Sequence, residues 1–237
     1  MRLIRSSVAL VILVVGCHWS GCLESRSATR TAPFEEQDLD AVLAIVIDLS
    51  GSYRALWDDK AYSLFLTLSD RFFQGAMGTE TRIVISQLSG SDQILLFEGT
   101  PTDLRKAFPT PEELNAFLQD NADPSGSRVN EATRRTLDHV RTLTGVGPET
   151  RLLTVILSDM QDSELDPGLQ TSAEEELRDA LHRYEAQGGA LALYYVAESE
   201  RGHWHDLLQE AGFPAGHYVI KSDLTSSPRL PQFESAP

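Results

Sequence analysis

Three stretches of the chain are almost wholly apolar, and they indicate where its sheet lies. They cover residues 41–47, 152–157 and 190–196. A continuous apolar run of this length is typical of a strand that is buried on both faces, as in a parallel sheet. Three other runs also predict strands, at 81–88, 93–97 and 217–220. The first strand, predicted over 41–48, passes directly into a polar segment and is expected to organise the fold.

Between these strands, apolar residues recur at steps of three and four, which is the spacing of one helical face. Two of the helices also have capping signals. Thr110 precedes Pro111, and Ser172 stands three residues before Glu175, as in a capping box. The pattern predicts helices at 53–74, 102–107, 111–118, 128–143, 173–186 and 202–211.

The alternation of strands and helices predicts a doubly wound, Rossmann-like α/β fold, with a mostly parallel sheet and helices on both faces. The turn between the strands at 81–88 and 93–97 is too short for a crossover, so these two strands must be antiparallel. The predicted domain covers residues 39–221. Residues 222–237 are rich in proline and serine and are predicted to form a disordered tail.

Composition limits the classes of partner. The chain has 237 residues, 41% of them apolar, and a formal net charge of -15. The apolar content suffices for one ordinary domain core. So acidic a chain is not expected to bind nucleic acid, because phosphate contacts need clustered Lys and Arg.

The N-terminal sequence predicts a targeting signal that is not part of the folded domain. Residues 1–16 have a basic start and a short apolar segment, as a secretory signal does. The sequence Val14-Val15-Gly16 before Cys17 resembles the bacterial lipoprotein box. That resemblance implies cleavage before Cys17, lipidation of this residue, a tether over 17–38, and a periplasmic, membrane-anchored location in the cell envelope. His18 mildly favours the outer membrane. An uncleaved anchor helix, or a secreted protein with a Cys17–Cys22 disulfide, remains an alternative.

Three loops carry candidate chemistry at the carboxyl edge of the predicted sheet. The side chains they supply are Asp48, Ser50 and Ser52 after the first strand, Ser125 and Ser127 before the helix at 128–143, and Asp159 after the strand at 152–157. In open parallel sheets, ligands bind outside the carboxyl ends of the strands. All of these groups are hard oxygens, which suit Mg²⁺, Mn²⁺ or Ca²⁺ and not zinc or copper.

The pattern resembles a von Willebrand factor A (vWA) domain over about residues 39–221. Asp48-Leu49-Ser50-Gly51-Ser52 matches the D-x-S-x-S signature of the metal-ion-dependent adhesion site, and Gly126-Ser127 and Asp159 match its second and third elements. The resemblance implies that Ser50, Ser52 and Ser127 offer hydroxyls to a Mg²⁺ ion (or Mn²⁺ or Ca²⁺). Asp48 and Asp159 would hold the ion mostly through waters. It also implies a protein partner that presents an Asp or Glu carboxylate to the metal, and no enzymatic activity.

Two departures from the family pattern affect these assignments. Ser127 stands where the family has Thr, and Met160 follows Asp159 where Gly is usual. The third loop is therefore expected to take a different path, in which Asp162 could add or replace a carboxylate. Ser125 is a rival to Ser127.

Other functions remain open from the sequence. Ser50 or Ser52 could simply cap the helix at 53–74, and a vWA-like scaffold could bind partners without metal. A Mg²⁺-dependent hydrolase or phosphatase of doubly wound fold is a further alternative. The second carboxylate that such a phosphatase needs is replaced by Ser50.

Overall fold

The computed structural model describes residues 38–50, 62–75, 80–88, 93–122, 126–222 and 230–231. All of them belong to one unit of the chain, Glu36–Pro237. The predicted signal, the tether and Cys17 lie outside the described residues. So do Ser52 and Ser125, two of the candidate site residues.

Six strands form one sheet, in the order β3-β2-β1-β4-β5-β6. Only the β2–β3 pair is antiparallel, and the other four pairs are parallel. This confirms the predicted doubly wound α/β fold with one antiparallel edge strand. The strands are β1 (Ala41–Ile47), β2 (Thr81–Gln87), β3 (Leu95–Gly99), β4 (Arg151–Leu157), β5 (Ala190–Tyr194) and β6 (Tyr218–Lys221).

The strand order reverses between β1 and β4. From β1 the chain builds outward to β2 and β3, and it then returns to the other side of β1 to add β4, β5 and β6. The place where the strand order reverses is called the switch point of the sheet. The loops on its two sides leave in opposite directions and open a crevice, in which open α/β sheets bind their ligands. The loops that follow β1 and β4 carry Asp48 and Asp159.

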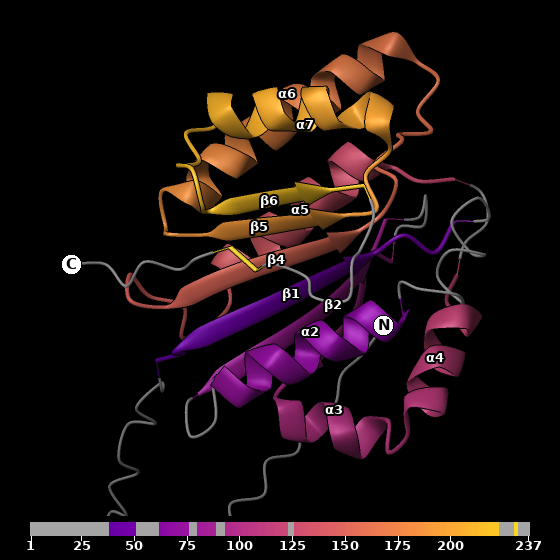
Figure 1. Ribbon diagram of the computed structural model, residues 1–237, viewed down its shortest axis with the longest axis vertical. Helices are drawn as coiled ribbons and strands as arrows, with labels where there is room; N and C mark the ends of the chain where they lie inside the picture. Colours follow the sequence, from indigo (N-terminus) through magenta and orange to yellow (C-terminus); the bar gives the residue numbers. More distant parts are fainter. Residues whose placement is uncertain are drawn as a thin grey trace, which may run out of the picture. The chain divides into compact units, whose positions relative to one another are not determined.

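Helices cover both faces of the sheet (Figure 1). They are α2 (Tyr62–Gly75), α3 (Pro101–Ala107), α4 (Pro111–Asp120), α5 (Val129–Arg141), α6 (Pro167–Glu185) and α7 (Glu198–Glu210). Successive side chains of β1 point to opposite faces. The even-numbered residues, from Val42 to Val46, pack in one core cluster with α5, α6 and α7. The odd-numbered residues, from Leu43 to Ile47, pack in a second cluster with α2, α3 and α4.

Two helices begin earlier than the sequence pattern predicted. Helix α6 begins at Pro167, because the side chain of Asp166 accepts hydrogen bonds from the backbone N–H groups of Gly168 and Leu169. Proline is tolerated at this first helical position, where its missing N–H would have no partner within the helix. The capping box at Ser172 is therefore not used to start a helix. Helix α7 begins at Glu198 and runs through Gly202, which was predicted to be its first residue.

The remaining elements lie close to their predicted ranges. Thr110 caps α4 as expected, since its hydroxyl accepts from the backbone N–H of Glu113 at 3.3 Å. Strand β3 lies two residues further along the chain than predicted, and its pairing with β2 shifts register between Ile85 and Ser86. Helix α2 is described from Tyr62 onward, so the predicted start of this helix near residue 53 lies outside the described residues.

The segment predicted to be a disordered tail contacts the core at the residues that are described. Leu230 packs against the cluster with α2, α3 and α4, and Pro231 is buried. Among the described residues, no helix has the length and apolar character needed to cross a membrane.

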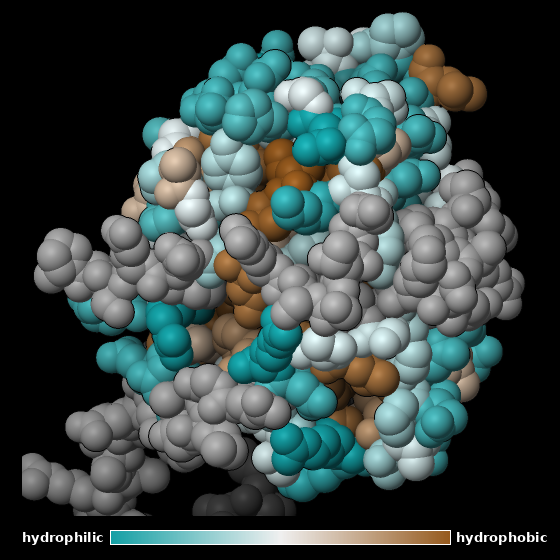
Figure 2. All heavy atoms as spheres, in the orientation of Figure 1, coloured by the Kyte–Doolittle hydropathy of each residue, from teal (hydrophilic) through white to brown (hydrophobic). Residues whose placement is uncertain are grey.

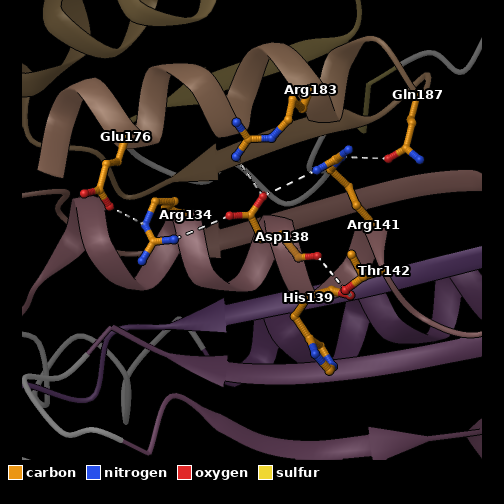
Figure 3. Close-up of polar contacts among 8 residues, drawn as sticks. All are labelled: Arg134, Asp138, His139, Arg141, Thr142, Glu176, Arg183 and Gln187. Carbon is orange, nitrogen blue, oxygen red and sulfur yellow. Dashed lines mark hydrogen bonds and ion pairs between the residues drawn. The ribbon is translucent and has the colours of Figure 1, made fainter.

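An ion-pair network joins α5 to α6 on the surface (Figure 3). Three arginines, Arg134, Arg141 and Arg183, surround the carboxylate of Asp138 at nitrogen–oxygen distances of 3.5, 3.4 and 3.0 Å. Arg134 also pairs with Glu176 of α6 at 3.2 Å. The surface over α6 and α7 is largely hydrophilic in the view of Figure 2.

Candidate functional site

Asp48 follows the last residue of β1 and is the centre of the candidate site. Its backbone N–H donates to the carbonyl oxygen of Leu157 at 2.9 Å, and the residue is only 1% exposed. Oδ1 accepts from the backbone N–H of Ser50 and from the hydroxyl of Ser127, both at 3.0 Å, and Oδ2 accepts from the hydroxyl of Ser158 at 2.8 Å. One buried carboxylate thus joins the ends of β1 and β4 to the segment that leads into α5.

The segment before α5 holds Ser127 in the site. Its backbone N–H donates to the hydroxyl of Ser163 at 3.0 Å, and its carbonyl oxygen accepts from the backbone N–H of Ser163 at 2.8 Å. Gly126 has a φ of +127°, and a Cβ on it would lie 2.9 Å from the Cβ of Ser163. Glycine is therefore required both for the backbone conformation and for the close approach. The backbone N–H of Arg128 donates to the carbonyl oxygen of Leu88 at 2.9 Å, which fixes this segment to the end of β2.

Ser158 is next to Asp48 because of the register of the sheet. Ile47 of β1 pairs with Leu157 of β4, so the residues that follow them lie side by side. The hydroxyl of Ser158 donates to Asp48 and accepts from the backbone N–H of Met160 at 2.8 Å. A fully buried serine thus connects the central carboxylate to the turn that follows β4.

The turn after β4 has an uncommon backbone conformation at Met160. Its φ of 65° lies in the left-handed region, which few residues other than glycine adopt. Glycine, the residue that the vWA resemblance expects here, would adopt this conformation without cost. The side chain of Met160 is 2% exposed and packs in the core cluster with α5, α6 and α7. Burial of the thioether side chain therefore offsets the backbone strain.

Asp159 lies near Asp48 but is not hydrogen-bonded to it. Its Oδ1 accepts from the backbone N–H of Gln161 at 3.0 Å. Burial raises the pKa of the Asp159 carboxyl group, the hydrogen bond from Gln161 lowers it, and the negative charges of Asp48 and Glu200 raise it further. The two aspartates are thus close enough for their charges to repel one another.

Asp162, which the sequence left open as a further carboxylate for the metal, accepts hydrogen bonds from backbone groups. Its Oδ2 accepts from the backbone N–H of Asn130 at 3.0 Å, and its Oδ1 accepts from that of Glu164 at 2.8 Å. Helix α5 has no side-chain cap from its own N-cap residue, Arg128. Asp162 therefore supplies the cap from a distant segment.

Of the five candidate metal ligands, the structure describes four. Asp48, Ser50 and Ser127 are linked by hydrogen bonds and are at most 3% exposed, and Asp159 lies near them. Ser52 is outside the described residues, as is Ser125, the rival to Ser127. Whether Ser50 or Ser52 caps a helix also depends on residues that are not described.

The chemistry of these groups fits a hard divalent cation. They are carboxylate and hydroxyl oxygens, which Mg²⁺ and Mn²⁺ prefer. Among the described residues, neither Asp48 nor Asp159 forms an ion pair with a basic side chain. A buried carboxylate without an opposite charge is costly, and a cation would offset that cost. The described part of the chain holds no group of three or more His, Cys, Asp or Glu arranged for a metal, so the hypothesis depends on the hydroxyl ligands.

Sequence reasoning did not assign Ser158 and Ser163 to the site. The signal for Ser158 was present, because it follows the apolar run of β4 at the position that matches Asp48 after β1. Ser163 has no comparable signal. Its two hydrogen bonds with Ser127 depend on the path of the loop between β4 and α6.

Comparisons with known proteins support the fold. No protein-family model matches the chain, and no curated protein is significantly similar to it. The pilus adhesin SpaC from Lactobacillus rhamnosus GG matches with a TM-score of 0.51 and 12% identity, over 80% of this chain and 29% of that chain. The PilB minor pilin from Streptococcus sanguinis matches with a TM-score of 0.51 and 11% identity, over 81% of this chain and 59% of that chain. The manganese-loaded TRAP protein of Plasmodium vivax matches with a TM-score of 0.46 and 13% identity, over 79% of this chain and 69% of that chain.

These similarities concern the fold alone, because the identities are so low. The chain spans less than two thirds of the length of either pilus protein. The two matches with a TM-score of 0.51 support a doubly wound α/β fold for this chain.

Proposed function

We propose that this chain is an envelope-anchored domain that binds a protein partner through a divalent metal ion. The ligands would be Ser50, Ser52 and Ser127, with Asp48 and Asp159 acting mostly through waters. The ion would be Mg²⁺, or Mn²⁺ or Ca²⁺. The observation that carries the proposal is the carboxylate of Asp48, which is buried at the switch point of the sheet and hydrogen-bonded to groups from three segments.

The chemistry of these ligands favours docking over catalysis. Neutral hydroxyl groups leave most of the charge of a divalent ion uncompensated, and Mg²⁺ is rarely enclosed by protein ligands alone. When bound, the ion would supply a positive charge that attracts a carboxylate oxygen. The partner would therefore present an Asp or Glu side chain. Within the chain, Asp48 would keep the hydroxyl of Ser127 oriented toward the ion.

The anchoring part of the proposal rests on the N-terminal sequence. Cys17 follows a segment like a lipoprotein signal, so its lipid would hold the domain at the periplasmic side of the cell envelope. The pilus proteins among the structural neighbours are named as an adhesin and a minor pilin, and these names are compatible with a binding role at a cell surface.

Calorimetric titration of the full chain in detergent with Mg²⁺ and with Mn²⁺ tests the metal. We expect one site per chain, and thermal unfolding that shifts upward as metal is added, because a bound ion stabilises the native state by about 2.7 kcal/mol at a hundred times its Kd. Asp48→Asn, which keeps the shape of the side chain, and Ser127→Ala should each abolish binding. Asp138→Asn removes a carboxylate from the α5–α6 network and should leave binding unchanged. Equal binding by wild type and Asp48→Asn would contradict the proposal.

A metal-free scaffold is the second candidate, and one observation favours it. Both oxygens of Asp48 already have hydrogen-bond donors within the protein, so the cluster could be purely structural. Under this alternative, neither ion would bind, and capture of the partner from envelope extract would be equal with and without a chelator. Metal binding that is lost in Asp48→Asn would exclude it.

A further inference from the structure

A polar pocket lies directly beside the candidate metal site. It has a volume of about 420 Å³ and is formed by the start of α5, the turn after β4, and residues of α6 and α7. Met160 and Gln161, which follow Asp159, are part of its wall. The backbone N–H of Ala197, just before α7, donates to the carbonyl oxygen of Asp159 at 2.9 Å, so the α7 side of the pocket is tied to the site.

The wall of this pocket is acidic. Asp162, Glu174 and Glu200 contribute carboxylates, and the one basic residue of the wall is His203. Glu174 is paired with Arg178 at 3.0 Å and lies 3.9 Å from Nε2 of His203, whereas Glu200 forms no ion pair with a described residue. The surrounding chain has the same character. Residues 159–176 carry seven Asp or Glu and no Lys, Arg or His. Such a cavity concentrates negative potential, which favours a cationic group.

The side-chain amide of Asn130 faces the pocket. Asn130 is 6% exposed and lines the pocket. Its backbone N–H donates to Asp162, and its side-chain amide makes no hydrogen bond to another described residue. The amide atoms are not fully buried, so water fills their hydrogen-bonding positions when the pocket is empty. A ligand with N–H donors can replace that water at the carbonyl oxygen of the amide.

Trp204 forms part of the same wall, and it is 1% exposed because it packs in the core cluster with α5, α6 and α7. Its indole group therefore reports on the pocket without offering an open ring face to a ligand. The carboxylates and the amide oxygen together suit a planar cation that carries several N–H donors, such as the arginine side chain.

We propose that this pocket receives an arginine or lysine side chain of the same protein partner whose carboxylate would bind the metal. The pocket borders the metal site, so one partner segment can reach both. The cationic contact supplies specificity, because acidic ligands that lack a nearby basic residue would meet a repulsive wall. The part of the inference that involves the metal rests on the proposed function, whereas binding of a cation by the pocket does not.

The probe for the test is Nα-acetyl-argininamide, and its matched control is Nα-acetyl-citrullinamide, which has nearly the same shape and no charge. Each is titrated into the ¹⁵N-labelled full chain in detergent, with a chelator present, and the indole resonance of Trp204 is followed. We expect the arginine compound to shift this resonance with a Kd in the millimolar range. The citrulline compound should bind at least ten times more weakly.

Two variants locate the binding. Glu200→Gln removes a pocket carboxylate and should weaken binding of the arginine compound about tenfold. Glu175→Gln makes the same change on an exposed residue of α6 outside the pocket and should leave binding within about twofold of wild type. Equal binding of the two compounds, or no effect of Glu200→Gln, would overturn the proposal.

The chelator separates this proposal from the proposed function. Binding of the arginine compound with chelator, in a chain that binds no Mg²⁺ or Mn²⁺, would support the pocket and reject the metal. If the chain binds Mg²⁺ or Mn²⁺ but the arginine compound does not shift the Trp204 resonance, the pocket proposal is rejected and the metal site stands.

Discussion

Two aspartates of this chain each sit at the centre of a polar cluster, and their surroundings differ in kind. Asp138 on α5 has a side chain that is 31% exposed and is met by three arginines. Asp48 after β1 is 1% exposed and is met by two serine hydroxyls and a backbone N–H. The first carboxylate is neutralised by the chain, and the second has no basic partner among the described residues.

This difference indicates which cluster is a candidate site. A half-exposed ion-pair network on two helices is screened by water and makes a modest contribution to stability. A buried carboxylate keeps its charge only if the surroundings compensate it, and hydroxyl groups do so only in part. Under the proposed function, a bound cation would supply the opposite charge that Asp48 lacks, whereas the three arginines already supply it at Asp138.

The largest expected effect comes from Asp48→Ala. It would leave the hydroxyls of Ser127 and Ser158 and the backbone N–H of Ser50 without their acceptor in a buried place. We expect the free energy of unfolding to fall by roughly 3 kcal/mol, since each unsatisfied buried group costs about 1–3 kcal/mol. Urea denaturation in chelator measures this fall. A loss below about 1 kcal/mol would show that Asp48 and Asp138 contribute similarly to the free energy of unfolding, which contradicts the comparison.

Gly126→Ala should have an intermediate effect. The φ of +127° and the 2.9 Å approach of a Cβ to Ser163 both disfavour alanine, so we expect a loss of roughly 2 kcal/mol. Metal binding should weaken as well, because Ser127 would be displaced. Gly147→Ala is the control, since a Cβ at Gly147 would have no atom within 4 Å. If both variants unfold at the same urea concentration, the close contact with Ser163 is unimportant.

The smallest effect is expected for Asp138→Ala. Its arginine partners are partly exposed, and Arg134 keeps its second contact with Glu176. We expect a loss of less than about 1 kcal/mol, which declines further as salt is raised to 1 M. Denaturation at low and high salt measures it. A salt-independent loss as large as that of Asp48→Ala would contradict the comparison.

Much of the fold could be predicted because its signals are local. The apolar runs of β1, β4 and β5 are long enough to identify buried strands, and the short turn after β2 forces an antiparallel neighbour. The predictions failed where two local signals competed. The proline and glycine at the start of α6 suggested a loop, yet Asp166 caps a helix there. Gly202 suggested the start of α7, yet the helix begins at Glu198, and its buried residues Trp204 and Leu207 both follow Gly202.

Local patterns in the chain specify the types and the order of the groups at the carboxyl edge: Asp48, Ser127 and Asp159, each at the end of a strand or the start of a helix. The contacts between these groups depend on the three-dimensional fold. Sheet register puts Ser158 beside Asp48, the loop after β4 brings Ser163 to Ser127, and Asp162 caps α5 while a pocket opens beside Asn130. These contacts join residues far apart in the chain, and their geometry is set by the packing of whole elements, which no local pattern encodes.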